Sequence, residues 1–257
     1  MKICAIALAF AGLASIEAAN AESDTDFQLL TLDGNKVKWS GTVNTGVVIT
    51  YALVDEAMHF AGARNCAGLV PIDGLIATSR ITRVLFEQEV AAAFSMWAQV
   101  ADVVFRPTRD ATTAGILIGA QQQPVGHAFT NVDYRTTADQ SGMITKSLIC
   151  LNPDKQWKVG FGGSDATYDV RYTVAHEIGH AIGLDHPDSS GQLMSFAYQE
   201  RFRMPQAGDI DGIRRLYGEK RHPSFARQPG EAEQPALQEA EPQGTTGKSL
   251  GLSSPQE

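Results

Sequence analysis

The sequence predicts one α/β domain built from a mixed sheet and a few helices. Short runs of β-branched and aromatic residues have the composition of strands. Three longer segments carry apolar residues at helical spacing. The order strand, helix, several strands, helix, loop, helix is typical of helices packed on a sheet. The composition agrees, since 43% of the 257 residues are hydrophobic, as in ordinary globular proteins.

Residues 47–54 are the first long strand candidate, because Val, Ile, Thr and Tyr fill most of the positions. A turn at residues 33–35, with the sequence Asp-Gly-Asn, precedes it. We expect further strands at residues 103–105, 116–118 and 143–151.

Residues 81–100 form the first predicted helix, and Ser79 is the candidate for its N-terminal cap. The apolar residues that share one broad stripe of this helix are Val84, Leu85, Val90, Ala91, Phe94, Trp97 and Ala98. A second helix is predicted at residues 168–184 and a third, short one at residues 209–217. Residues 57–79 show no clear period, so we expect a loop there, or an insertion with a short helix.

The N-terminus has the pattern of a secretory signal. Lys2 provides a positive charge, residues 3–15 are apolar and uncharged, and Ala19 and Ala21 are the small residues that a signal peptidase reads. A buried N-terminal helix or a membrane anchor is the alternative, but the run is shorter than the roughly 20 residues that span a bilayer. We therefore predict cleavage after Ala21 and export to the extracellular space or the periplasm.

The other end of the chain has a different composition. Residues 219–257 are rich in Pro, Gln, Glu, Gly and Ser, so we expect a disordered tail. The predicted organisation is a signal at 1–21, a folded domain at 22–218 and this tail. The net charge of −8 lacks the basic excess of nucleic-acid binding proteins. We expect a monomer without a nucleic-acid or membrane partner.

Two cysteines remain after removal of the signal, which contains Cys4. Cys66 and Cys150 form an even pair in an oxidising compartment, so a disulfide between them is the leading interpretation. Two free buried thiols, or a thiolate bound to a metal, are the alternatives.

The chemistry-bearing motif is His-Glu-x-x-His, from His176 to His180. On a helix, residues four apart lie on one face, so both imidazoles can reach one metal ion. Glu177 is one residue further round the helix, which keeps its carboxylate off the metal but beside a metal-bound water. A bare motif of this kind also arises by chance, so the residues that follow decide the interpretation.

Gly183 lies where the helix can end with a residue at positive φ, and the chain can then return His186 as a third ligand. Three protein nitrogens leave a position for water, as in catalytic rather than structural zinc sites. Zinc would lower the pKa of that water, and Glu177 would take its proton and hand it to the leaving amine. The spacing therefore predicts one catalytic zinc, held by His176, His180 and His186.

This extended motif resembles that of the metzincin metallopeptidases. Metzincins place a methionine in a tight turn beneath the metal, and Met194 lies at the expected distance downstream. Within this group the chain is most similar to the matrixins, especially short bacterial ones. The segments that carry the similarity are 49–51, 91–97, 103–105, 126–129 and 209–218. The resemblance covers residues 27–218 and implies a twisted, mixed five-stranded sheet with three helices.

Two features of animal matrixins lack full counterparts. His127 and Cys150 take the places of two ligands of a second, structural zinc, but the remaining His and Asp ligands are missing. We therefore expect a single zinc; His127 would then merely line the cleft. No room for an inhibitory propeptide is expected between Ala21 and the first strand, and the surroundings of Cys66 do not reproduce the family's inhibitory motif.

The chain also resembles the serralysins, another metzincin group, in two places. These are Pro187, directly after the third histidine, and the pair Met194-Ser195. Serralysins have a tyrosine that can reach the metal at the position where this chain has Phe196. They also have calcium-binding repeats downstream, and residues 219–257 contain no such repeats. Tyr198 fits the matrixin pattern, in which this segment walls the pocket for the residue after the scissile bond. Tyr172, one helical turn before the first ligand, is expected in the same pocket and would make it shallow.

Calcium sites are the other metal prediction. The candidate carboxylates, which lie in predicted loops, are Asp133, Asp139, Asp154 and Asp165. None of them forms a recognisable loop motif, and solvated acids are the alternative.

The predicted function is that of a secreted zinc endopeptidase acting on protein or peptide substrates, with an edge strand near residues 126–129 that binds substrate by strand addition. A serralysin-like peptidase, a zinc-bound but non-catalytic binding module and a hydrolase of non-peptide amides are the alternatives.

Overall fold

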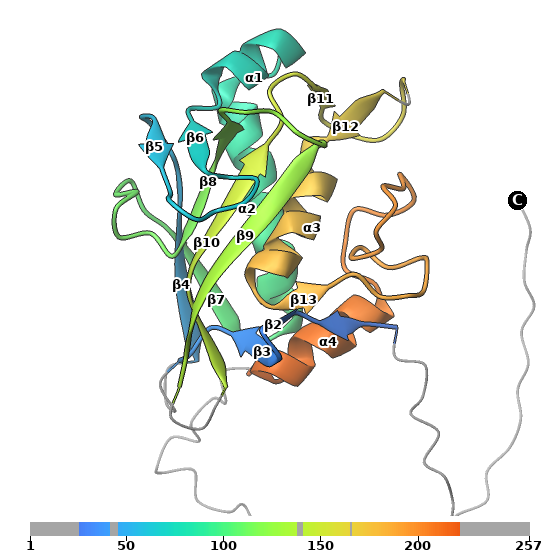
Figure 1. Ribbon diagram of the computed structural model, residues 1–257. Coiled ribbons are helices and arrows are strands. Elements are labelled where there is room, and N and C mark those ends of the chain that lie inside the picture. The colour runs from blue at the N-terminus through green and yellow to red at the C-terminus, as the bar shows by residue number, and fades with distance from the viewer. Residues whose placement is uncertain (1–25, 42–45, 138–140, 165, 222–257) are drawn as a thin grey trace, which may run out of the picture. The chain divides into compact units, whose positions relative to one another are not determined.

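The computed structural model describes residues 26–41, 46–137, 141–164 and 166–221 (Figure 1). The predicted signal at 1–21, Asp139, Asp165 and the tail from residue 222 onward lie outside these ranges. The elements are β1 Gln28–Leu29, β2 Thr31–Leu32, β3 Asn35–Lys38, β4 Val47–Leu53, β5 Met58–His59, β6 Gly68–Val70, α1 Asp73–Ser79, α2 Arg83–Val100, β7 Val103–Pro107, β8 Ile116–Gln121, β9 Ala128–Thr136, β10 Gly142–Leu151, β11 Gln156–Lys158, β12 Thr167–Asp169, α3 Val170–Ala181, β13 Leu184–Asp185 and α4 Ala207–Tyr217.

The predicted mixed sheet is confirmed. Its central strands follow the order β7-β4-β8-β10-β9; β7, β4, β8 and β10 run parallel, and β9 pairs antiparallel with β10. These are the five strands that the matrixin resemblance implies. Four short strands, β2, β3, β5 and β6, extend the same sheet at its margins.

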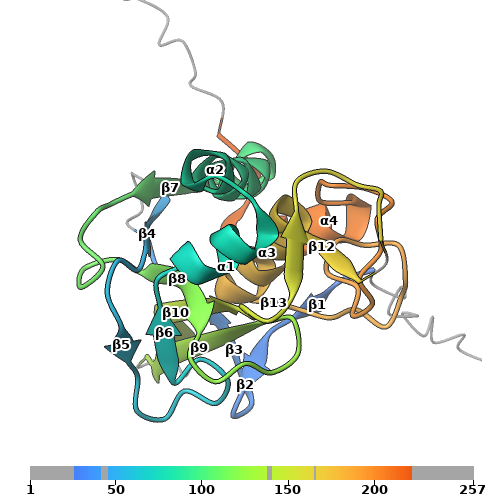
Figure 2. The same cartoon turned by 90° about the horizontal axis from the view of Figure 1, so that it is seen from above.

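Helices α2 and α3 pack side by side on one face of the sheet (Figure 2). The β5–β6 hairpin, which pairs with β8, contributes Met58 and Leu69 to the apolar cluster on the other face. The two faces hold separate apolar clusters. Alternating residues of β8 divide between them, since Ile116 and Ile118 face the helices and Leu117 faces away. In β10, Ile149 and Cys150 divide in the same way. Both faces of the central strands are therefore covered, as is usual for parallel strands.

The first long helix, α2, begins later than its predicted cap. Thr82, rather than Ser79, caps α2, because its hydroxyl accepts the N–H of Leu85 at 3.2 Å. The predicted apolar stripe was also partly wrong. Val84, Leu85 and Ala91 are exposed, whereas Phe86, Glu89, Val90, Ala93, Phe94 and Trp97 are buried. Because apolar residues lie all round α2, its sequence alone did not select the packed face.

Residues 57–79 contain the expected short helix, α1, together with a hairpin that the sequence did not reveal. β5 and β6 pair antiparallel, and β6 also pairs with β8. The leading interpretation of the cysteines is confirmed, because Cys66 forms a disulfide with Cys150 of β10, with their Cα atoms 5.7 Å apart. The bridge therefore fastens this insertion to the sheet.

No helix in the described ranges is long and apolar enough to cross a membrane.

Candidate metal centre

Helix α3 carries three of the four residues of the predicted catalytic site. His176 and His180 lie one helical turn apart on the same side of α3, with Glu177 beside them. The other side of the helix packs into the main core through residues such as Val174 and Ile178. Burial of the apolar face therefore fixes the direction in which the two imidazoles point.

The chain turns back at Gly183, the position that the spacing singled out. Gly183 has a φ of 104°, and its N–H donates to the carbonyl of His180 at 3.0 Å. A Cβ at this position would overlap the carbonyl of Val37 and lie 3.1 Å from Leu216 Cδ1. Both the conformation and the space require glycine. Strand β13 then leads to His186, beside the two helical imidazoles.

The three histidines present a compact set of nitrogens. His186 Nε2 lies 3.2 Å from His176 Nε2 and 3.2 Å from His180 Nε2. Nitrogens bound at about 2.0–2.1 Å to one tetrahedral zinc would be about 3.3 Å apart. Ligand atoms of all three lie within 4.8 Å of one another, and no other such group of three occurs among the residues that the structure describes. The donor set therefore fits a single zinc ion.

Two backbone carbonyls orient the helical imidazoles. His176 Nδ1 lies 2.8 Å from the carbonyl of Leu193, and His180 Nδ1 lies 2.9 Å from that of Leu184. A carbonyl only accepts, so each Nδ1 carries the proton and each Nε2 keeps its lone pair for a metal. Burial lowers the pKa of His176 well below 6.5 and that of His180 to about 4. Both rings are then neutral at neutral pH, as metal binding requires.

Glu177 places a buried carboxylate on the floor of the site. Its Oε2 accepts a hydrogen bond of 2.7 Å from the hydroxyl of Thr130, on β9, and within the described residues its Oε1 accepts none. Burial raises the pKa of Glu177 to about 7, although the Thr130 hydrogen bond lowers it. A carboxyl group with a pKa in this range is suited to proton transfer near neutral pH. The sequence had given no sign of Thr130.

Met194 lies beneath the histidines, in a turn formed by residues 192–195. The N–H of Ser195 donates to the carbonyl of Gln192 at 3.2 Å and closes this turn. The Met194 side chain is buried against Gly179 of α3, where there is no room for a Cβ. This is the location expected of a methionine that supports the metal site without binding the ion.

Asp209, in the first turn of α4, holds this turn and was not foreseen as a site residue. Its carboxylate accepts the N–H of Leu193 at 2.7 Å and that of Met194 at 3.0 Å. Because the carbonyl of Leu193 accepts from His176, hydrogen bonds connect α4 to a predicted ligand. The sequence marks Asp209 through a capping box with Gln206, but that signal indicates only where α4 starts.

The histidines open into a cleft of about 930 Å³ that follows β9. Residues of β9 that line it include Ala128, Thr130 and Asn131. Strand β9 pairs with β10 on one side, and no second partner occurs in the part of the chain that is described. Its open edge therefore leaves backbone groups available along the cleft.

The comparison with known families decides what this arrangement is. The family model described as matrixin matches residues 75–218. This chain belongs to the matrixin family.

Curated relatives agree with this assignment. The matrixin is 30% identical over 198 residues to metalloendoproteinase 1 of Glycine max, covering 68% of this chain and 60% of the relative. It is 29% identical over 150 residues to matrilysin of Mus musculus, covering 56% of this chain and 55% of matrilysin. It is 26% identical over 162 residues to neutrophil collagenase of Homo sapiens, covering 57% of this chain and 32% of the collagenase. The chain spans 60% or less of the length of these relatives.

The three residues predicted for the substrate pocket, His127, Tyr172 and Tyr198, come together in this matrixin. The Tyr172 and Tyr198 rings lie 4.8 Å apart, and His127 stacks on Tyr168 at 4.8 Å. With Phe196 and residues of α3, His127 and Tyr198 line a small, partly open pocket of about 10 Å³ beside His176. Burial raises the pKa of the Tyr198 phenol, so its hydroxyl keeps the proton.

A second zinc site is not assembled from its two candidate ligands. Cys150 is consumed by the disulfide with Cys66, and His127 stacks on an aromatic ring. The matrixin also lacks a serralysin-type tyrosine ligand at this position, because Phe196 offers no donor atom. Phe196 is 80% exposed, and its ring lies 5.1 Å from that of His186. Calcium binding stays a prediction, and its described candidates, Asp133 and Asp154, are exposed. The expectation that Asp133 lies in a loop was wrong, because it belongs to strand β9 and pairs with Lys146 of β10.

Proposed function

We propose that this matrixin is an exported zinc endopeptidase that hydrolyses peptide bonds in extended segments of protein substrates, and that residues 22–218 are its catalytic domain. The observation that carries the proposal is the set of three Nε2 atoms, two pairs of them 3.2 Å apart, beside the buried Glu177 carboxylate. His176, His180 and His186 would hold the ion. A bound zinc supplies Lewis acidity, which activates water near neutral pH and polarises a carbonyl.

Glu177 is the general base in this proposal. Its Oε2 is engaged by Thr130, so Oε1 takes the proton of the attacking water. The same carboxyl group then donates this proton to the leaving amine, and the glutamate returns to its ionised form. Burial raises the pKa of Glu177 and so helps the carboxyl group to hold the proton between the two transfers.

The open edge of β9 would bind the substrate as an additional strand. Backbone hydrogen bonds to an edge strand hold a peptide extended and independent of its sequence, while pockets select side chains. The pocket between Tyr172 and Tyr198 lies next to His176, which supports its assignment to the residue after the scissile bond. Strand addition accounts for a protein substrate better than for a small non-peptide amide.

Export is supported by two independent features. The N-terminal pattern that ends at Ala21 is that of a cleavable signal. The Cys66–Cys150 disulfide is typical of proteins that fold in an oxidising compartment.

Cleavage of casein or gelatin, measured with and without a zinc chelator, tests the function. We expect activity that the chelator removes and added zinc restores, and a loss of roughly two to four orders of magnitude in Glu177→Ala. Glu87→Ala, on the exposed surface of α2, is the matched control and should remain active. Equal turnover by wild type and Glu177→Ala would overturn the proposal and favour a zinc-bound binding module.

A further inference from the structure

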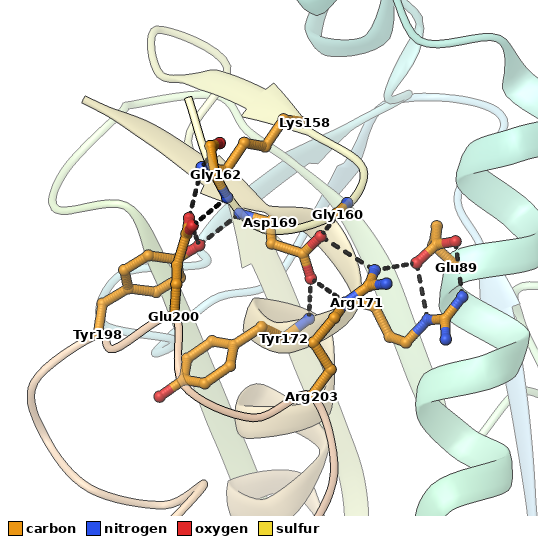
Figure 3. A network of polar contacts seen from close by, with 10 residues as sticks. All are labelled: Glu89, Lys158, Gly160, Gly162, Asp169, Arg171, Tyr172, Tyr198, Glu200 and Arg203. Atoms are coloured by element: carbon orange, nitrogen blue, oxygen red, sulfur yellow. Dashed lines mark hydrogen bonds and ion pairs between the residues drawn. The ribbon is translucent and has the colours of Figure 1, made fainter. Parts of the chain in front are cut away.

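A network of ion pairs adjoins the small pocket (Figure 3). Its centre is Arg203, whose Nη2 lies 2.6 Å from Glu89 Oε2 on α2 and whose Nε lies 2.9 Å from Asp169 Oδ1 at the start of α3. The side chain of Glu89 is 5% exposed and that of Asp169 is 0% exposed. Because a buried charge without a partner is strongly destabilising, both carboxylates hold the guanidinium in place.

The same network fastens residues 196–204, here called the pocket wall. The hydroxyl of Tyr198 accepts the N–H of Asp169 at 2.7 Å and donates to Glu200 Oε1 at 2.9 Å. Glu200 Oε2 in turn accepts the N–H of Gly162 at 2.7 Å. The wall is thus attached at its middle by these contacts and near its end by the arginine (Figure 3).

We propose that Arg203 is a positioning residue that keeps the pocket wall against α3, and that the fixed wall restricts the residue after the scissile bond to a small side chain such as Gly, Ala or Ser. This inference rests on the proposed peptidase function. The Tyr172 and Tyr198 rings, 4.8 Å apart, occupy most of this space and leave a pocket of only about 10 Å³, so a leucine side chain fits only if one of these rings moves, and Tyr198 belongs to the wall. Arg203 opposes a movement of Tyr198, because both residues bind Asp169, Tyr198 through the Asp169 N–H and Arg203 through its carboxylate.

The chain offers a matched control in Arg171. This residue of α3 also binds Glu89, through Nε at 2.7 Å and Nη2 at 2.8 Å. It makes no hydrogen bond or ion pair with residues 196–204 as far as the structure describes the chain. Its replacement therefore removes a cation from the same buried carboxylate without releasing the pocket wall.

The experiment compares Arg203→Met and Arg171→Met on two peptides that differ only in Ala or Leu after the cleaved bond. Wild type should prefer Ala. In Arg203→Met the ratio of kcat/KM for the Leu peptide to that for the Ala peptide should rise at least about tenfold, the usual effect of a few methylene groups in a pocket. In Arg171→Met the ratio should stay unchanged. Arg203→Lys, which retains a cation, should restore part of the preference.

A second measurement reports on the wall itself. Amide hydrogen exchange at residues 196–204 should accelerate in Arg203→Met and not in Arg171→Met. A wild-type preference for Leu, or the same change in both Met variants, or no change in either, would overturn the inference. Absence of chelator-sensitive cleavage in wild type would instead contradict the proposed function, so the two failures are distinguishable.

Discussion

Gly179 illustrates how a single missing side chain determines the contact beneath the metal site. It lies within α3, where glycine is less favourable than alanine by roughly 1 kcal/mol. Helix propensity alone would therefore favour alanine. A Cβ at this position would, however, overlap Met194 Sδ and lie 3.2 Å from Trp97 Cζ2. The space beneath the ligand pair excludes the better helix former.

Replacement of Gly179 by alanine should destabilise the protein despite the gain in helix propensity. Overpacking of a tight core costs about 1–3 kcal/mol, which exceeds that gain. We expect a lower free energy of unfolding in denaturant titrations, together with weaker zinc binding, because Met194 or α3 must shift.

Gly74→Ala is the matched control. Gly74 lies in α1, and a Cβ there would meet nothing within 4 Å. That change should be neutral or stabilising by up to about 1 kcal/mol. If both variants gain stability, the close packing inferred at Gly179 is wrong.

At the scale of elements, the predicted ligands depend on a helix that contributes none of them. Helix α4 presents the buried carboxylate of Asp209 to the backbone of residues 192–195, and the same segment accepts the proton of His176 Nδ1. Contacts of this kind, one step behind a ligand, orient the imidazole and strengthen it as a donor. The position of α4 is therefore transmitted to the metal site through one turn.

Asp209→Asn should weaken zinc binding and reduce activity although the side chain keeps its shape. Leu193 and Met194 donate to different oxygens of the Asp209 carboxylate, and in asparagine one of these positions becomes an NH2 group, which cannot accept. Loss of such a contact typically lowers metal affinity by about 10–100-fold. Competition with a chromogenic chelator measures the affinity.

Asp211→Asn provides the comparison for this change. Asp211 lies in the same helix but is exposed, so its replacement should leave zinc affinity unaltered. Equal affinities for wild type and Asp209→Asn would show that the 192–195 turn is held by other contacts.

At the scale of the whole described domain, the two faces of the sheet carry different stabilising features. The main core and the metal site lie on the side of the helices, and the Cys66–Cys150 disulfide lies within the smaller cluster on the other side. Changes at separate sites without shared partners usually add. The disulfide should thus contribute to stability independently of the metal.

Replacing both cysteines by serine should lower the free energy of unfolding by about 2–5 kcal/mol, as for other native disulfides that close long loops. Zinc content and the affinity for zinc should not change, because the bridge has no contact with the histidines. Thermal unfolding of wild type and of the double variant, each with and without chelator, measures both effects. A chelator effect that differs strongly between the two proteins would contradict their independence.

The metal site was largely predictable because its spacing is local. His176, His180, Gly183 and the return of His186 follow from the geometry of one helix and its end, and the family pattern supplied Met194. Thr130 and Asp209 could not be foreseen, since they reach the site from β9 and α4 through tertiary packing. Nothing in the local sequence specifies those contacts.

The fold shows the same division between local and tertiary information. Strands β4, β8 and β10 were foreseen from their β-branched and apolar residues. The packed face of α2 was misjudged, because Val84 and Leu85 are as apolar as the residues that the sheet buries. The β5–β6 hairpin was missed, since its strands are two and three residues long and depend on pairing with β8.

The open edge of β9 also determines how the protein must be handled. An edge strand does not distinguish a foreign peptide from an extended segment of another copy of the same protein, because it binds backbone. We therefore expect the concentrated, metal-loaded enzyme to digest itself, at a rate that increases with concentration. Storage in dilute solution, or with the metal withdrawn until use, should preserve it, and the points of self-cleavage would provide a first sample of the sequences that its cleft accepts.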